Sequence, residues 1–242
     1  MIELILLGLI YPLLILVISY LAFRGKLWGS SRNWIFIGVG YMMLAVLVQI
    51  PIQEIPTVIT IIRSGIIGVM EAEKSGGLAV AIYAGSVAGV SQEVAKFFAV
   101  KGREPIASLW VGYGFSIIDV TVLIASILAT AIFAPKTVLP LISLIGLLIN
   151  PIVSVLFHPG TAMFLRYSQE LGSGVRGLIV TTLAHAYMDS YVEALNYLAA
   201  FGAASLGRLY WLTAIMWSTA LAISICFMII GHLLIRGIAS RR

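Results

Sequence analysis

AGVSQEVAKFFAV, residues 88–100, places Gln92, Glu93 and Lys96 in an apolar stretch that begins near Leu78. On a helix Glu93 and Lys96 are spaced i,i+3, and Gln92 and Lys96 are spaced i,i+4. An ionised side chain at membrane depth costs several kcal/mol, so it normally faces the interior of a helix bundle and pairs with something there. An internal ion pair that only helps helices pack is one interpretation. A buried functional site is the other.

The composition places this stretch in a membrane protein. Of 242 residues 61% are hydrophobic and 10% are charged, and the mean hydropathy of +1.07 excludes a soluble globule. The predicted fold is all-α, a polytopic transmembrane bundle forming a single integral membrane domain over residues 1–242. Cys226 is the sole cysteine, which excludes a disulfide framework and a cysteine metal site. The lipid bilayer is the expected partner, and no nucleic-acid motif appears.

Apolar stretches long enough to span a membrane predict seven helices. They run approximately over 2–22, 34–51, 78–100, 106–133, 138–164, 176–199 and 209–236. The first lacks a basic leader and a small-residue cleavage site, which predicts an uncleaved first helix. The stretch TVITIIRSGIIGVM, 57–70, is short for a span and carries Arg63, so we interpret it as an interfacial or re-entrant helix. Counting it as a span gives the eight-span alternative.

The distribution of Lys and Arg favours seven spans, with the N-terminus outside, the C-terminus cytoplasmic and the plasma membrane as location. The cytoplasmic side then holds ten basic residues: Arg24, Lys26, Arg32, Lys101, Arg103, Arg166, Arg176, Arg236, Arg241 and Arg242. The outer side holds four: Arg63, Lys74, Lys136 and Arg208. With eight spans the two sides would carry roughly equal numbers.

Two further patterns concern packing. Ala81, Gly85 and Gly89 form a small-residue stripe on the third predicted span, which favours close approach of a neighbouring helix. Four tryptophans lie near predicted helix ends, where indole rings suit the headgroup region. They are Trp28, Trp34, Trp110 and Trp211.

More polar residues lie inside the next three spans. Asp119 shares a helical face with Gly112 and Ser116, and His158 precedes Pro159. His185, Asp189 and Glu193 follow one another at four-residue spacing in the sixth span. With alternating helix directions the depth is similar, roughly 10 to 20 Å below the cytoplasmic surface at 1.5 Å per residue, for Glu93, Asp119, His158, His185 and Asp189. A shared polar cavity opening to the cytoplasmic side is therefore predicted.

Two histidines and several carboxylates in one buried layer are compatible with a zinc site, which needs three protein ligands and a water. The spacing does not identify one by itself. A membrane histidine can equally donate a hydrogen bond between helices, and Asp189 can be the acceptor for His185.

The order of these motifs resembles that of the PrsW-type intramembrane metalloproteases. These belong with the CAAX-processing, bacteriocin-processing (CPBP) and YhfC-like proteins in one membrane superfamily. The resemblance rests on QEVAK, GYGFSIID, a histidine in the next span and HAYMD, and covers Ala88 to about Ala194. It implies a helical membrane fold, zinc, and peptide hydrolysis inside the membrane. A transmembrane peptide or a prenylated protein is the implied substrate.

Carried over by position, the resemblance assigns roles and reveals departures. The matching positions are Glu93 (second glutamate), Lys96 (basic residue), Gly112, Gly114 and Phe115 (G-x-G-F), and His158 and His185 (the two histidines). Gln92 stands where a glutamate acts as general base, and an amide cannot accept that proton. Asp119 replaces a longer glutamate, and Val120 replaces an asparagine. Asp189 takes the place of a polar residue after the last histidine.

Three functions follow as hypotheses. The first is a metalloprotease-like protein in which His158 and His185, with a carboxylate from Glu93, Asp119 or Asp189, bind Zn²⁺. In it Lys96 holds a carboxylate or stabilises negative charge, and Gln92 impairs catalysis. The second is a non-catalytic membrane subunit that binds a transmembrane segment or lipid. The third is a small proton- or ion-coupled transporter, although no internal repeat of the transporter kind is seen.

Overall fold

Helices account for the whole regular structure of the described chain. This computed structural model describes residues 2–24, 32–133, 141–202 and 204–239. Within them lie seven helices and no strand: α1 (Ile2–Phe23), α2 (Trp34–Gln53), α3 (Ile55–Val100), α4 (Ala107–Phe133), α5 (Leu141–Glu170), α6 (Gly174–Ala200) and α7 (Leu206–Ala239). The predicted all-α bundle is confirmed, and each predicted span lies on one of these helices. The predicted start of the fifth, at 138, falls outside the described residues.

Five described segments are long and apolar enough to cross a membrane: Trp34–Gly65, Gly76–Val100, Ala107–Ala129, Leu144–Glu170 and Leu206–Ile238. Helix α1 has an apolar segment too, Leu7–Phe23, but it is shorter than these five. Helix α6 is not among the five, because Arg176, Asp189 and Glu193 interrupt its apolar sequence. It packs along α3 and also contacts α5 and α7, and it buries His185 and Thr181 in the bundle while Arg176 and Glu193 stay exposed.

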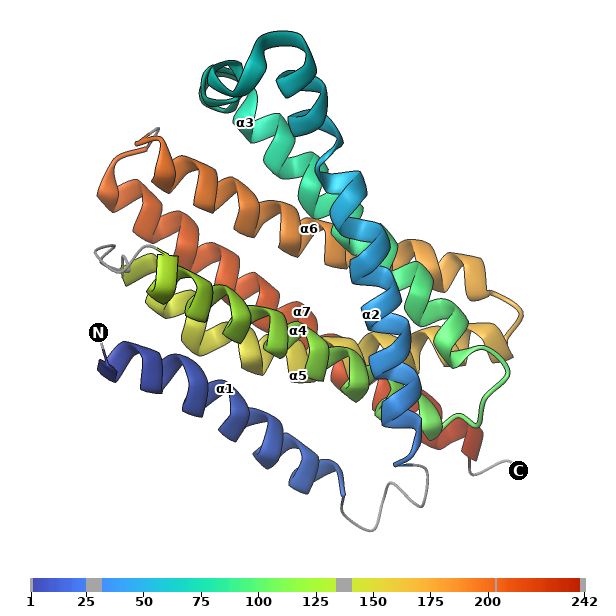
Figure 1. Cartoon of the computed structure of the whole chain (residues 1–242). Helices are drawn as coiled ribbons and strands as arrows, with labels where there is room; N and C mark the ends of the chain where they lie inside the picture. The colour runs from blue at the N-terminus through green and yellow to red at the C-terminus, as the bar shows by residue number, and fades with distance from the viewer. Residues whose placement is uncertain (1, 25–31, 134–140, 203, 240–242) are drawn as a thin grey trace.

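The segment predicted as one short helix over 57–70 is divided in the structure. Gly65 breaks it with φ 69° and ψ −177°, a conformation open to glycine but costly for other residues. Residues before the break extend the apolar run of α2, and residues after it belong to the long second part of α3. The chain reverses direction across this region (Figure 1). The prediction of a separate helix over 57–70 is therefore wrong in its boundaries.

Glycines set the closest helix contacts around the site. A Cβ on Gly85 would lie 2.2 Å from the backbone nitrogen of Ser190, and one on Gly89 would lie 2.5 Å from that of Ala186. The predicted small-residue stripe therefore faces α6. On α4, a Cβ at Gly112 would meet the carbonyl oxygen of His158 at 2.4 Å. These contacts bring the backbones of α3 and α6, and of α4 and α5, close enough for short polar side chains to meet.

The two ends of the bundle differ in charge. The starts of α2, α4 and α6 and the ends of α3, α5 and α7 gather at one end, and α1 lies at the edge against α4 and α5 (Figure 1). We call this the basic end, after the described residues at or near it: Arg24, Arg32, Lys101, Arg103, Arg166, Arg176 and Arg236. The positive-inside bias predicts that it is cytoplasmic.

One expected membrane anchor is a core residue. Trp110 has no exposed surface and packs against Tyr20 and Tyr113, with ring centroids 5.8 and 6.1 Å away. Its position three residues into α4 faces α1, so the headgroup interpretation is wrong for it. Trp211 is 74% exposed, as an anchor would be. Trp28 lies outside the described residues.

Candidate metal centre

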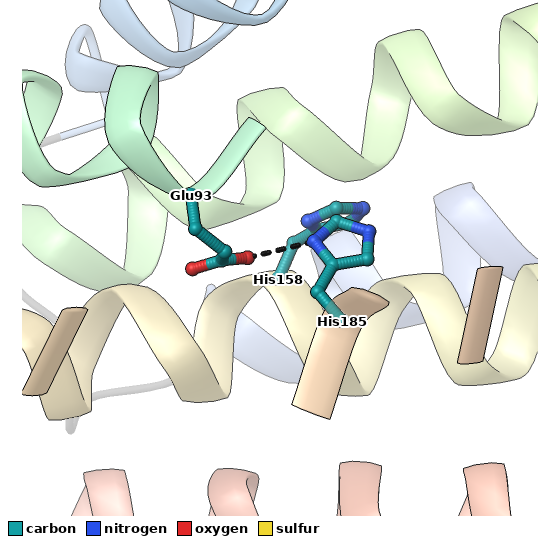
Figure 2. A group of neighbouring side chains, drawn as sticks. All are labelled: Glu93, His158 and His185. Carbon is teal, nitrogen blue, oxygen red and sulfur yellow. Dashed lines mark hydrogen bonds and ion pairs between the residues drawn. The ribbon is translucent and has the colours of Figure 1, made fainter. Parts of the chain in front are cut away.

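Glu93 lies at the centre of a buried polar cluster. Its side chain has no exposed surface, and its Oε1 accepts a hydrogen bond from Lys96 Nζ at 2.5 Å. The same oxygen lies 2.9 Å from His185 Nδ1 on α6 (Figure 2). The close contact between α3 and α6 at Gly85 and Gly89 makes this short distance geometrically accessible.

The ammonium group of Lys96 contacts side chains from three helices. Besides Glu93, its Nζ donates to Thr161 Oγ1 at 2.8 Å, and the Thr161 hydroxyl in turn donates to the backbone of α5. The ammonium lies 5.3 Å from the ring centroids of both Phe115 and Phe157. Aromatic faces attract cations at this range. The Glu93–Lys96 ion pair predicted from i,i+3 spacing is therefore confirmed.

The two histidines meet beside Glu93. His158 on α5 and His185 on α6 have ring centroids 5.3 Å apart (Figure 2). Each Nε2 is near a carboxylate: Asp119 Oδ2 is 3.6 Å from that of His158, and Asp189 Oδ2 is 3.5 Å from that of His185. A carboxylate behind an imidazole is the usual support of a metal-binding histidine, because it fixes the tautomer and the ring orientation.

Three side chains of this cluster fit a metal ion. Glu93, His158 and His185 each offer a ligand atom, all within 4.8 Å of one another. Glu93 Oε2 and His158 Nδ1 are buried and have no hydrogen-bond partner in the described structure, and buried polar atoms without partners are rare. Ligand atoms around tetrahedral Zn²⁺ lie about 3.3 Å apart, given metal–nitrogen distances of about 2.0–2.1 Å. Shifts of about 1 Å would close the set, so the three residues can hold a metal ion.

The face of α4 predicted from Gly112, Ser116 and Asp119 does contact α5. Ser116 Oγ donates to the carbonyl oxygen of Ser154 at 2.8 Å, and Asp119 reaches His158. Val120, the next residue, is instead 1% exposed and belongs to an apolar cluster that includes Leu16. The position where an asparagine was expected therefore lies away from the metal centre.

The side chain of Gln92 contacts other residues than the side chain of Glu93 does. Its Nε2 donates to Gln49 Oε1 on α2 at 3.1 Å, in keeping with the turn of about 100° between consecutive helical residues. Gln49 then donates to Gln53, and Gln53 donates to the carbonyl oxygen of Ala84. We call Gln92, Gln49 and Gln53 the glutamine relay. Sequence analysis did not identify Gln49 and Gln53, although two glutamines four residues apart at the end of an apolar run were a usable signal.

A cavity of about 600 Å³ adjoins the metal centre. Its polar lining consists of Gln49, Gln53, Gln92, Asp119, Ser126, Asn150, Ser154, His158, His185, Asp189, Glu193 and Asn196. Glu93 and Lys96 are not among the lining residues. The expectation that one cavity is lined by all the predicted site residues is therefore correct for Asp119, Asp189 and the two histidines. It is wrong for Glu93 and Lys96, which lie fully buried behind the cavity.

The cavity extends toward the end of the bundle opposite the basic end. Along α5 its lining runs from His158 back to Gly146, and along α6 from His185 forward to Asn196. Both directions lead away from the basic end. On the basic side, Phe115 and Val100 are fully buried and neither lines the cavity. The expected opening at the basic end is therefore wrong, because buried side chains fill that part of the bundle.

Comparisons with protein-family models, with curated proteins and with solved structures gave no match. The residues themselves must therefore carry any functional argument.

Proposed function

We propose that this protein is a membrane-embedded, zinc-dependent hydrolase that cleaves a peptide bond within the membrane. The observation that supports it most is the convergence of Glu93, His158 and His185 from three helices, with buried unpartnered atoms, beside a cavity. Two imidazoles and a carboxylate are a common catalytic donor set for Zn²⁺. The motif order that resembles the PrsW-type metalloproteases points to the same chemistry.

Each neighbouring group has a role in this proposal. Asp119 and Asp189, 3.6 and 3.5 Å from the Nε2 atoms of His158 and His185, would orient the two rings, and the partnerless Nδ1 of His158 would bind the metal. For His185 the metal would replace the present contact between Nδ1 and Glu93 Oε1. Lys96 holds Glu93 Oε1, so that Oε2 is the ligand atom. When bound, Zn²⁺ lowers the pKa of a coordinated water and polarises a carbonyl.

The proposed activity is slow in the natural sequence. Gln92 stands at the position of the expected general base, and its amide cannot take a proton from water. Asp119 and Asp189 reach the cavity, but each is engaged with a histidine. A base of this type typically supplies a factor of about 10²–10⁴ in rate.

Metal analysis tests the centre directly. Purified protein should retain about one zinc per chain, and His158→Ala or His185→Ala should release it because two ligands hold zinc poorly. His232→Ala is the matched control, since this third histidine lies on α7 outside the cluster. Full zinc retention by both cluster variants would exclude this centre.

Restoring the base tests the hydrolase. The Gln92→Glu variant should cleave a membrane-embedded peptide about 10²–10⁴ times faster than the natural protein, and a chelator should abolish the cleavage. An inactive variant that still binds stoichiometric zinc would contradict hydrolysis while leaving the metal centre intact.

A non-catalytic membrane subunit is the second candidate. The observation that favours it is the 2.5 Å contact between Lys96 Nζ and Glu93 Oε1, which neutralises the buried carboxylate without a metal. In that case zinc is substoichiometric, and the histidine variants lose stability rather than metal.

A further inference from the structure

The charged residues that line the cavity are all acidic. Asp119, Asp189 and Glu193 are among the lining residues, and no lysine or arginine of the described chain is. The side chains of Asp119 and Asp189 are 30% and 32% exposed, whereas Glu93 behind them is fully buried. Lys96 forms its ion pair with Glu93 rather than with a cavity carboxylate. The open part of the site therefore favours a positive charge.

One further lining residue has a buried oxygen without a partner. Gln92 is 6% exposed, and its Oε1 has no hydrogen-bond partner in the described structure. Leaving such an atom unpaired in a buried setting typically costs about 1–3 kcal/mol. The atom can accept a hydrogen bond, so a ligand that supplies an N–H donor would satisfy it.

The glutamine relay fixes the orientation of the Gln92 amide. The carbonyl oxygen of Ala84 can only accept, so Gln53 must direct its NH₂ group to it at 2.7 Å. Gln53 Oε1 then accepts from Gln49 Nε2 at 3.2 Å, and Gln49 Oε1 accepts from Gln92 Nε2 at 3.1 Å. The free end of the relay is consequently the Gln92 oxygen, an acceptor.

Much of the remaining lining is apolar. It includes Val46, Leu123, Ile127, Met216 and Trp217. A cavity of several hundred Å³ with an apolar wall and a few convergent polar groups has the form of a small-molecule site. A ligand that fits both parts has a cationic N–H head and an apolar body.

We propose that this cavity binds an alkylammonium group. The ammonium lies between Asp119 and Asp189 and donates hydrogen bonds to the acceptors on this wall, and the alkyl part packs on the apolar lining. The group can belong to a free long-chain amine or to the lysine side chain of a membrane-embedded peptide. This inference concerns the cavity of the proposed hydrolase, but the binding requires neither metal nor catalysis.

The test measures binding to the full chain in a non-ionic detergent, in chelator-treated and in zinc-loaded protein. Dodecylammonium should bind at least tenfold more tightly than dodecanol, which has the same tail and no charge. Dodecyltrimethylammonium, a cation without N–H groups, should lie between them. Equal binding of dodecylammonium and dodecanol would overturn the proposal. Zinc content is measured on the same samples, so failure of the metal centre is seen separately.

Variants assign the effect to the cavity. Asp119→Asn with Asp189→Asn should remove the preference for dodecylammonium over dodecanol, whereas Glu54→Gln, the same change at an exposed position, should keep it. Gln92→Met leaves the carboxylates intact and should abolish only the advantage of dodecylammonium over dodecyltrimethylammonium. If the aspartate double variant does not fold, Gln92→Met alone tests the proposal. The proposal is then overturned if Gln92→Met still binds dodecylammonium more tightly than dodecyltrimethylammonium by the same factor as the unmodified protein.

Competition with peptides distinguishes a free long-chain amine from the lysine side chain of a membrane-embedded peptide. A polyleucine transmembrane peptide with a central lysine should displace dodecylammonium if the natural ligand is a peptide, and the matched norleucine peptide should not. Displacement by neither peptide assigns the site to a free amine. Displacement by both peptides to the same extent contradicts recognition of the ammonium group.

Discussion

The ammonium of Lys96 is enclosed by Glu93, Thr161 and two aromatic rings, with no exposed surface. Lys96→Met should therefore lower the free energy of unfolding by about 3–5 kcal/mol, because it leaves the Glu93 carboxylate buried and unpaired. Equilibrium unfolding in detergent measures the change. Lys101→Met, at an exposed position, is the control and should change stability little.

The double variant makes this prediction specific. Adding Glu93→Gln to Lys96→Met removes the unpaired charge, so most of the lost stability should return. If the double variant is as unstable as Lys96→Met alone, packing of the lysine stem rather than charge pairing explains its effect.

At this scale the sequence predicted which residues meet but not how they meet. The spacing of His158, His185 and Glu93 from the helix ends placed them at one depth, and the structure brings them together. The contact of Glu93 with His185 could not be predicted, because it depends on the rotation of α6 about its own axis. Packing of Gly85 and Gly89 sets that rotation, and sequence identifies the glycine stripe without identifying its partner.

Helix pairs are organised by these glycines, and the α3–α6 contact is the clearest case. Gly85→Ala should destabilise the protein by about 1–3 kcal/mol, since the new methyl group would lie 2.2 Å from the Ser190 backbone nitrogen. Because α6 must then move away, Gly85→Ala should also weaken metal retention. Thermal unfolding and metal content measure the two effects.

The matched control for this change lies on α2. A Cβ on Gly40 would meet no atom within 4 Å. Gly40→Ala should therefore be neutral or slightly stabilising, as alanine favours a helix over glycine by about 1 kcal/mol. Equal effects of the two alanines would show that helix propensity, not close packing, determines the result.

Element boundaries were predictable where the chemistry changes sharply along the chain. Apolar runs bounded by charge, glycine or proline correspond to the helices. The division of 57–70 was not predictable, because the segment contains two glycines, Gly65 and Gly68, and either can end a helix. Of these two glycines, Gly65 has a positive φ and Gly68 does not. Gly68 stays helical, and a Cβ there would lie 2.2 Å from that of Ser64.

For the whole molecule, the position of the cavity predicts the side from which water reaches the metal centre. Given a cytoplasmic basic end, Ser126→Cys in a Cys226→Ala background should react with a membrane-impermeant maleimide added outside the cell. Lys101→Cys, at the basic end, should react only after the membrane is opened. The reverse pattern would invert the orientation of the bundle.

The filled basic side of the bundle has a kinetic consequence. Phe115 and Val100 are fully buried on that side and do not line the cavity, so we expect a ligand to enter and to leave at the other end of the bundle. Occupancy is therefore single-file: a second molecule waits until the first has departed, and an excess of competitor cannot drive the first out from behind. The residence time of a ligand in the cavity is then determined by how easily it passes the opening by which it entered.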